Sequence, residues 1–189
     1  YSITEKLRQH KIANPEFNYE VIKGTVSPIL LYVKLYNCRE PGNVVVFDDS
    51  DSIFQDVESL NLLKAATDTI KNRLISYTKL SNFLGSNEIP ESFYFEGQII
   101  FLSNIDFEEE SKKRTKNAVH IDALISRAHF VSVTLNTIQE KMIRIVSVIQ
   151  EHDLFKSYRL SKDVEEELIE FIETNANQFR EISIRTAIK

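Results

Sequence analysis

The chain has 189 residues, of which 42% are hydrophobic and 27% charged, an ordinary balance for a soluble globular protein with one substantial core. A formal net charge of −5 excludes whole-molecule attraction to nucleic acid or to an anionic membrane. A single cysteine, Cys38, excludes an internal disulfide framework and predicts a reducing, cytoplasmic compartment. Since no apolar run approaches the roughly 20 residues of a membrane-spanning helix, no membrane is expected among the partners.

The first part of the chain predicts a helix, a strand and a second helix. The first helix is expected over Thr4–Lys11, ending before Pro15, and a short strand is expected over Phe17–Ile22. Ser27 begins the next helix, with a proline in its first turn, where the missing N–H is harmless. The continuous, mostly β-branched run Val44–Phe47 is typical of a strand that is covered on both faces.

The next part continues this alternation. Apolar residues at helical spacing predict a helix within residues 53–64, and a second apolar run predicts a strand over Gln98–Ser103. A helix is expected over Ala118–Arg127, followed by a third strand over Phe130–Leu135. Strands that alternate with helices predict an α/β fold with a parallel sheet.

The last part predicts helices only. Thr137–Glu140 has the pattern of a capping box, Ser161 can begin a second helix, and Gln178–Lys189 suits a third. The sequence therefore predicts two domains, an α/β core over residues 1–135 and a small all-α domain over residues 136–189.

Two adjacent acids, Asp48 and Asp49, follow the first buried strand. Charges at the end of a buried strand are costly unless they face a crevice, solvent or a metal, and ligands of α/β sheets bind at that end of the strands. In a nucleotide site, the first acid can hold Mg²⁺ and the second can orient or deprotonate the water that attacks the γ-phosphate. The alternative is an acidic turn in which Asp49, Ser50 and Asp51 cap the next helix.

Four further polar residues lie where such a site would need them. Asn104 follows the second apolar strand and can hold the water or the γ-phosphate; otherwise it is an ordinary turn residue. Arg127 ends a helix just before the third predicted strand, a position that also suits the helix dipole. Arg180 and Arg185 lie in the last helical segment, where each, taken singly, can be a solvated or salt-bridged side chain.

This order of features resembles the AAA+ ATPases of the P-loop superfamily, over nearly the whole chain. The end of the first buried strand resembles Walker B, with Asp48 at the magnesium position and Asp49 where most members carry glutamate. Asn104 matches the sensor-1 position. Arg127, in a segment similar to the family's A-L-L-S-R stretch, matches the arginine finger.

The resemblance extends to the helical part. Arg185 is the better match to sensor 2, with Arg180 as the alternative, and residues 136–189 are similar to the family's helical lid. Residues 45–51 and 182–189 are loosely similar to ATPases encoded by tailed phages. The resemblance implies ATP and Mg²⁺ as cofactors, a homo-oligomeric ring, a hexamer, in which Arg127 acts in trans, and the remodelling or translocation of a protein or nucleic acid.

Two departures from the family pattern affect these expectations. No G-x-x-x-x-G-K-[ST] phosphate-binding loop occurs in the chain, and the resemblance places that loop just before Tyr1, so the sheet is expected to be incomplete at its N-terminus. Asp49 is one methylene shorter than glutamate, which predicts slow hydrolysis. The alternatives are an AAA+-like scaffold that does not hydrolyse ATP, and an unrelated α/β interaction protein.

The substrate of such a motor is not apparent from the sequence. Residues 68–95 contain Lys71, Arg73, Tyr77 and Lys79, a mixture of basic and aromatic side chains that can line the pore of a ring. The same residues are equally compatible with an ordinary exposed hairpin.

Overall fold

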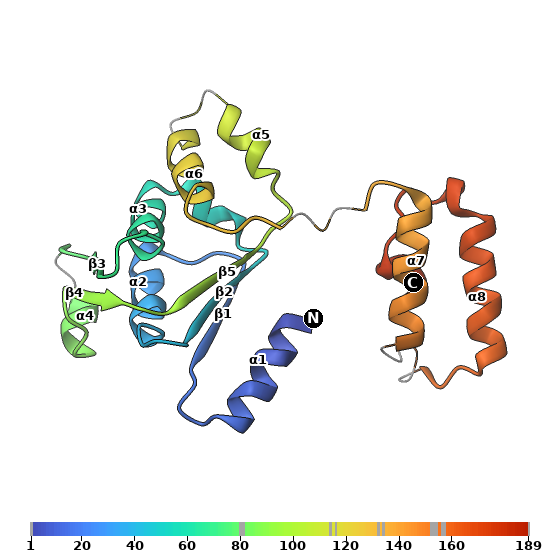
Figure 1. Ribbon diagram of the computed structural model, residues 1–189, viewed down its shortest axis with the longest axis horizontal. Coiled ribbons are helices and arrows are strands. Elements are labelled where there is room, and N and C mark those ends of the chain that lie inside the picture. Colours follow the sequence, from blue (N-terminus) through green and yellow to red (C-terminus); the bar gives the residue numbers. More distant parts are fainter. Residues whose placement is uncertain are drawn as a thin grey trace. The chain divides into compact units, whose positions relative to one another are not determined.

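The computed structural model of the protein describes two compact units, Tyr1–Phe130 and Val131–Lys189 (Figure 1). The described residues are 2–79, 82–113, 115, 117–131, 133, 135–151, 155 and 158–188. In this part of the chain, no helix combines the length and the apolar character that crossing a bilayer requires.

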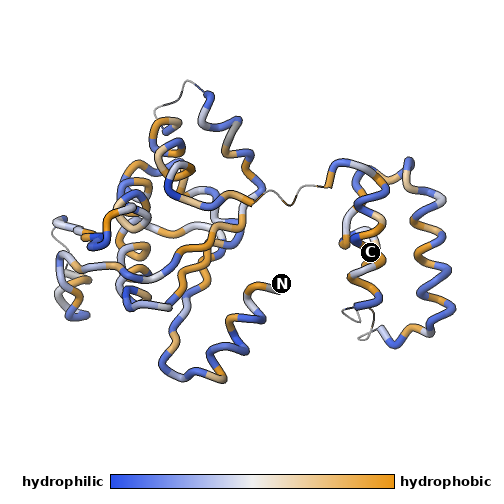
Figure 2. The backbone as a smooth tube through the Cα atoms, viewed as in Figure 1, coloured by the Kyte–Doolittle hydropathy of each residue, from blue (hydrophilic) through white to orange (hydrophobic). Residues whose placement is uncertain are grey.

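The first unit is built around a parallel sheet of three strands in the order β1-β2-β5. The strands are β1 (Tyr19–Lys23), β2 (Val44–Asp48) and β5 (Gln98–Leu102). The central strand, β2, is buried over its first four residues, and hydrophobic residues concentrate along the sheet (Figure 2). The prediction of a mixed α/β fold with a parallel sheet is therefore confirmed. The register places Asp48 beside Lys23 and Leu102, so all three strands end at the same edge.

Helices pack against this sheet and against one another. The described helices of this unit are α1 (Ser2–Ala13), α2 (Pro28–Asn37), η1 (Asp51–Gln55), α3 (Val57–Ala66), α4 (Asn82–Ser86), α5 (Phe107–Lys112) and α6 (Ala118–Ile125). The central helix, α3, contacts both α2 and α6. Its apolar residues Leu60 and Leu63 are fully buried in the same core as Leu31 and Leu35 of α2. Burial of these apolar side chains is the main stabilising contribution to the unit.

Two antiparallel strands, β3 (Arg73–Ser76) and β4 (Ser92–Phe95), form a hairpin within residues 68–95. The sequence of this stretch was compatible either with pore-lining loops or with an exposed hairpin. One face of the hairpin is buried through Ile75, Phe93 and Phe95. The hairpin residues therefore alternate between core and solvent, as in a half-buried sheet.

Gly97, between β4 and β5, lies where no side chain fits. A Cβ atom at this position would lie 2.1 Å from the carbonyl oxygen of Cys38 and 3.0 Å from the Phe95 ring. We therefore expect Gly97→Ala to lower the free energy of unfolding by roughly 2–3 kcal/mol, measured by urea denaturation. Gly85→Ala is the matched control because a Cβ there meets nothing within 4 Å. Equal stability of the two variants would contradict this packing.

The prediction of a third strand over Phe130–Leu135 is wrong at the residues of this stretch that the structure describes. Phe130, Val131 and Val133 have no strand conformation, and 53%, 75% and 84% of their surfaces are exposed. Residues 132 and 134 lie outside the described residues. The β propensity of valine and phenylalanine reflects packing on a neighbouring strand, and no strand of the described sheet pairs with this segment.

The described residues of the second unit include α7 (Ile138–Glu151), α8 (Lys162–Thr174), the 3-10 turn η3 (Ala176–Gln178) and α9 (Ile184–Ile188). Its core includes Met142, Ile145 and Ile172. The third helix is shorter than predicted, because residues 179–183, between η3 and α9, are not helical. In this stretch the Ile182 side chain is buried, and the Thr186 hydroxyl accepts from the Ser183 N–H.

The predicted capping box at the start of α7 is confirmed. The N–H of Glu140 donates to the Thr137 hydroxyl at 3.1 Å, and the Glu140 carboxylate accepts from the N–H groups of Asn136 and Thr137, each at 2.9 Å. The hydrogen bonds from Thr137 and Asn136 lower the pKa of Glu140, since they favour its charged form. This capping interaction therefore weakens as the pH falls through the pKa of Glu140.

Candidate functional site

Asp49 stands at the carboxyl edge of the sheet in an unusual backbone conformation. Its φ is 56°, in the left-handed region, which aspartate tolerates better than most L-residues. Its N–H donates to the carbonyl oxygen of Leu102, at the end of β5, at 3.0 Å. The chain therefore turns sharply as it leaves β2, and the Asp49 side chain is exposed while Phe47, two residues earlier, is buried.

Asn104 lies beside Asp49. Its side-chain amide donates to Asp49 Oδ1 at 3.3 Å. The contact arises because β2 and β5 are parallel neighbours, so the residues that follow them emerge at the same edge. The structure thus brings Asp48, Asp49 and Asn104 together, as their positions after two parallel strands predict.

Lys23 also belongs to this edge, and the sequence analysis missed it. Its ammonium lies 2.8 Å from Asp48 Oδ2, with 69% of the lysine side chain and 27% of the aspartate side chain exposed. An ion pair this exposed contributes at most about 1 kcal/mol, so a cation or a phosphate can displace one partner at little cost. Only the register of β1 against β2 shows that these two residues meet.

The residues around the acids are held by hydrogen bonds between strand ends. The Ser50 hydroxyl donates to the carbonyl oxygen of Ile22 at 2.8 Å, and the Ser103 hydroxyl donates to Asp51 Oδ1 at 2.6 Å. Neither Ser50 nor Asp51 caps α3: that role belongs to Asp56, whose carboxylate accepts from the N–H of Ser59. The helix that follows the turn directly is η1, for which Ser50 is the N-cap residue without a side-chain capping hydrogen bond, so the alternative of an acidic turn that ends the strand and precedes a helix stays open.

Arg127 lies at the other end of the sheet. Its guanidinium donates to the carbonyl oxygen of Lys64, in the last turn of α3, at 2.8 Å. Arg73 connects the end of α3 to the start of β5, because it donates to the carbonyl oxygen of Ala66 in α3 and to that of Gly97, the residue before β5. Arg127 is thus near the amino ends of the strands, and the structure does not bring it to the acids of its own chain.

Arg180 and Arg185 belong to the second unit. Both side chains are exposed, and Arg185 lies on α9. The two acids belong to the first unit, so a position of either arginine near them stays a prediction.

The donor set at the sheet edge suits Mg²⁺ together with a phosphate ligand. Among the described residues, no three His, Cys, Asp or Glu side chains gather as a metal cluster. Mg²⁺ seldom uses such a cage: it usually binds one or two carboxylates, several waters and the phosphates of a nucleotide. The carboxylate of Asp48 can provide one such ligand, the neighbouring Asp49 can accept from a water, and Lys23 and Asn104 provide hydrogen-bond donors for phosphate or water.

Two shallow hollows are described elsewhere on the protein. One is lined by Glu167, Glu170, Phe171, Thr174 and Asn175 on and after α8. The other is lined by His10, Asn14, Glu16, Phe17, Glu40, Pro41, Gly42 and Asn43, close to the amino ends of β1 and β2. Neither hollow contains the acids or Asn104, so neither forms part of the candidate site.

Comparison with known proteins gives one relative of this chain. The chain is 36% identical over 170 residues to an uncharacterized 36.7 kDa protein in the nrdC-mobD intergenic region of Enterobacteria phage T4. The match covers 90% of this chain and 52% of that protein, so the chain spans about half the length of its phage relative. No protein-family model matches the chain, and no solved structure matches it.

Proposed function

We propose that this edge is the catalytic end of an ATPase of the AAA+ kind, which couples ATP binding and hydrolysis to remodelling or translocation of a protein or nucleic acid. The observation that carries the proposal is the contact of Asp49 with Asn104 beside Asp48, at the carboxyl edge of adjacent parallel strands. Catalytic and nucleotide-binding residues of open α/β sheets gather at this edge.

Each residue has a role in hydrolysis. Asp48 would hold Mg²⁺, which would supply positive charge to neutralise the phosphates of the nucleotide. Asn104 donates to Asp49 Oδ1, so we assign Oδ2 of Asp49 to the attacking water. The water oxygen bonds to the γ-phosphorus, its proton passes to Asp49, and the bond from that phosphorus to the bridging oxygen breaks, releasing ADP and phosphate.

The proposal requires two further contributions to the phosphates. A glycine- and lysine-containing loop, supplied by polypeptide outside these 189 residues, would cradle the β- and γ-phosphates. Arg185 of the helical unit, with Arg180 as the alternative, would contact the γ-phosphate, as the sensor-2 resemblance implies. Lys23 would exchange its ion pair with Asp48 for a phosphate oxygen.

Arg127 would act on the nucleotide of a neighbouring copy. Its position at the amino end of the strands supports a role in trans, because from there it does not serve its own acids. The proposal therefore includes a homo-oligomeric ring, a hexamer as the resemblance implies, in which one copy completes the site of the next.

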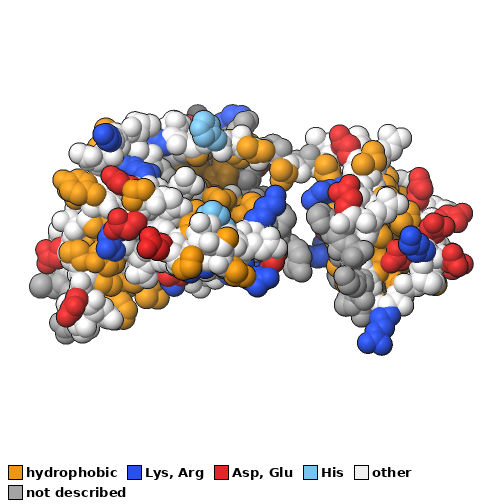
Figure 3. All heavy atoms as spheres, turned by 60° about the horizontal axis from the view of Figure 1, so that its bottom comes forward, with side chains coloured by type: hydrophobic (Ala, Val, Ile, Leu, Met, Phe, Trp, Pro, Cys, Tyr) orange, Lys and Arg blue, Asp and Glu red, His pale blue; other side chains and the backbone are white. Residues whose placement is uncertain are grey.

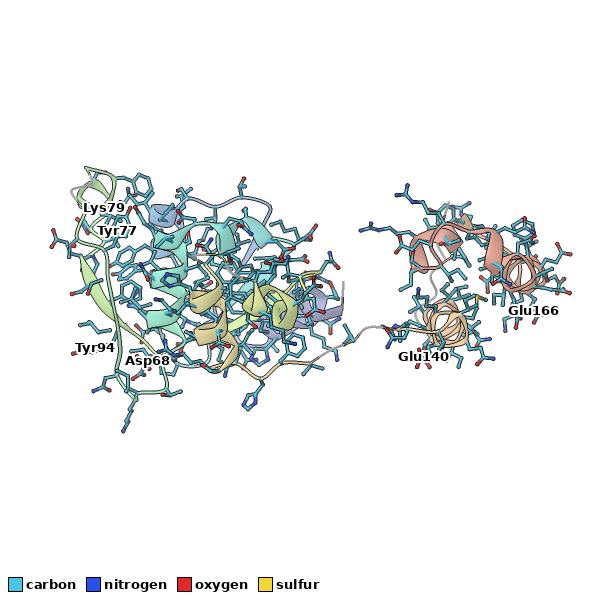
Figure 4. The ribbon with its side chains drawn as sticks, turned by 90° about the horizontal axis from the view of Figure 1, so that it is seen from above. Asp68, Tyr77, Lys79, Tyr94, Glu140 and Glu166 are labelled. Atoms are coloured by element: carbon cyan, nitrogen blue, oxygen red, sulfur yellow. The ribbon has the colours of Figure 1, made fainter. Side chains whose placement is uncertain are left out.

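Fewer residues around the hairpin are free to contact a substrate than the sequence predicted. Arg73 donates to backbone carbonyls, the Tyr77 ring lies tilted against the buried Tyr32 ring with 5.5 Å between the centroids, and Lys79 pairs with Glu58. Figure 4 labels Tyr77, Lys79 and Tyr94 on this part of the first unit. Of the residues named from the sequence, Lys71 remains as an exposed candidate. The hairpin adds the exposed Tyr94, which is paired with Leu74 across it.

The surface of α8 in the second unit is too acidic to favour binding of nucleic acid. In the space-filling view, acidic side chains gather on the second unit (Figure 3). The acids of α8 are Asp163, Glu165, Glu166, Glu167, Glu170 and Glu173, against one lysine. Such a surface repels the phosphate backbone, so nucleic acid would have to be contacted elsewhere.

A second candidate function is an AAA+-like scaffold that binds partners without hydrolysing ATP. Its support is the absence of a glycine-lysine phosphate loop from this sequence, whose four glycines are Gly24, Gly42, Gly85 and Gly97.

Binding of Mg-ATP separates the two functions. We expect the complete encoded polypeptide to bind Mg-ATP in a calorimetric titration, and this chain alone to bind it much more weakly. Asp48→Asn should reduce the Mg²⁺-dependent part of the affinity about tenfold or more, while Asp163→Asn on α8 leaves it unchanged. If the complete polypeptide does not bind Mg-ATP, the ATPase proposal is rejected in favour of the scaffold.

A further inference from the structure

Two side-chain hydrogen bonds connect the turns that carry Asp49 and Asn104, and a third lies within the turn after β5. The Ser103 hydroxyl donates to Asp51 Oδ1 at 2.6 Å and accepts from the N–H of Ile105 at 3.0 Å. The 2.6 Å distance is typical of a charge-assisted bond from a hydroxyl to a carboxylate. Asn104 donates across the same gap to Asp49 at 3.3 Å. The turn after β2 is thus tied to the turn after β5.

These bonds lie on either side of Asn104 and close to Asp49, two of the residues of the candidate site. The bond from Ile105 to Ser103 spans Asn104 and fixes the backbone on both sides of it, as in a serine turn. After β2, Asp51 at the start of η1 lies two residues after Asp49, whose left-handed backbone persists only where its surroundings hold it. A single hydroxyl therefore restrains both turns.

We propose that Ser103 and Asp51 form a clasp that positions Asp49 and Asn104 for catalysis. This inference rests on the proposed hydrolysis of ATP for its functional part, whereas the clasp itself is a property of the fold. Both residues are positioning residues, since they act through Asp49 and Asn104. Hydrolysis is sensitive to such placement because a water must meet Asp49 and the γ-phosphate in one geometry.

Hydrogen exchange of the Asp49 amide tests the clasp without nucleotide. In this chain, the Asp49 N–H donates to the Leu102 carbonyl at 3.0 Å and reports on the junction of the two strand ends. We expect Ser103→Ala to accelerate its exchange about tenfold, measured by NMR, because a hydrogen bond to a charged group is lost. Ser103→Thr, which keeps the hydroxyl, should restore slow exchange. Ser52→Ala, at an exposed serine of η1, is the matched control. Unchanged Asp49 exchange in Ser103→Ala would overturn the clasp.

Turnover by the complete polypeptide tests the positioning role. We expect Ser103→Ala to lower kcat about tenfold with little change in KM, and Ser103→Thr to recover most of it. Faster Asp49 exchange with an unchanged kcat would overturn the positioning role. Faster exchange in Ser103→Ala, with a wild-type polypeptide that hydrolyses no ATP, would support the clasp and reject the proposed function, so the two failures are distinguishable.

Discussion

Replacement of Asp49 by asparagine is expected to lower ATP turnover by the complete polypeptide about 10²–10⁴-fold. Asparagine keeps the size of the side chain and an oxygen that can accept from Asn104, but it cannot take a proton from water. The measurement is steady-state phosphate release at saturating Mg-ATP, accompanied by thermal unfolding to show that the fold is intact.

Asp122→Asn is the control for this substitution because Asp122 is an exposed acid on α6. It should hydrolyse ATP at the wild-type rate. If Asp49→Asn does so as well, Asp49 is not the base, and the assignment of its Oδ2 to the attacking water is wrong.

Replacement of Arg127 by alanine is expected to lower turnover about 10³-fold while ATP binding is retained. The reason is that an arginine supplied to a neighbour's nucleotide stabilises charge mainly in the transition state. In the isolated chain, the substitution removes one exposed hydrogen bond to the Lys64 carbonyl, so the stability should change little.

Mixing of variants tests the role in trans. Arg127→Ala subunits retain Asp49, and Asp49→Asn subunits retain Arg127. A mixed ring therefore contains some sites with both residues intact, and the mixture should recover part of the activity that each variant lacks. Wild-type turnover by Arg127→Ala at saturating protein, or no recovery on mixing, would remove the role in trans.

The contact between Asp49 and Asn104 was predictable from the sequence because it depends only on two parallel neighbouring strands. Continuous apolar runs marked β2 and β5, and the polar residues after each run emerged at one edge. The capping box at Thr137 was predictable for a similar reason, since its pattern is local.

Features that depend on register or on distant neighbours were not predictable. The pair of Lys23 with Asp48 and the bond of Ser103 to Asp51 require the alignment of strands, which one sequence does not reveal. Ser103 directly precedes Asn104, and a serine before a turn residue was a signal that the sequence analysis did not use. The prediction of a strand over Phe130–Leu135 was wrong because apolar β-branched residues do not show whether a neighbouring strand is present to pair with them.

The central claim is that the acids at the end of β2 and Asn104 surround one site for a divalent cation and a nucleotide. Its most direct test is NMR of the complete polypeptide with ADP and substoichiometric Mn²⁺, whose paramagnetism broadens the signals of nearby amides. We predict that the amides of Asp48, Asp49 and Asn104 broaden first, while those of α8 stay sharp. Broadening that begins at the acidic residues of α8, or that is uniform along the chain, would contradict the claim.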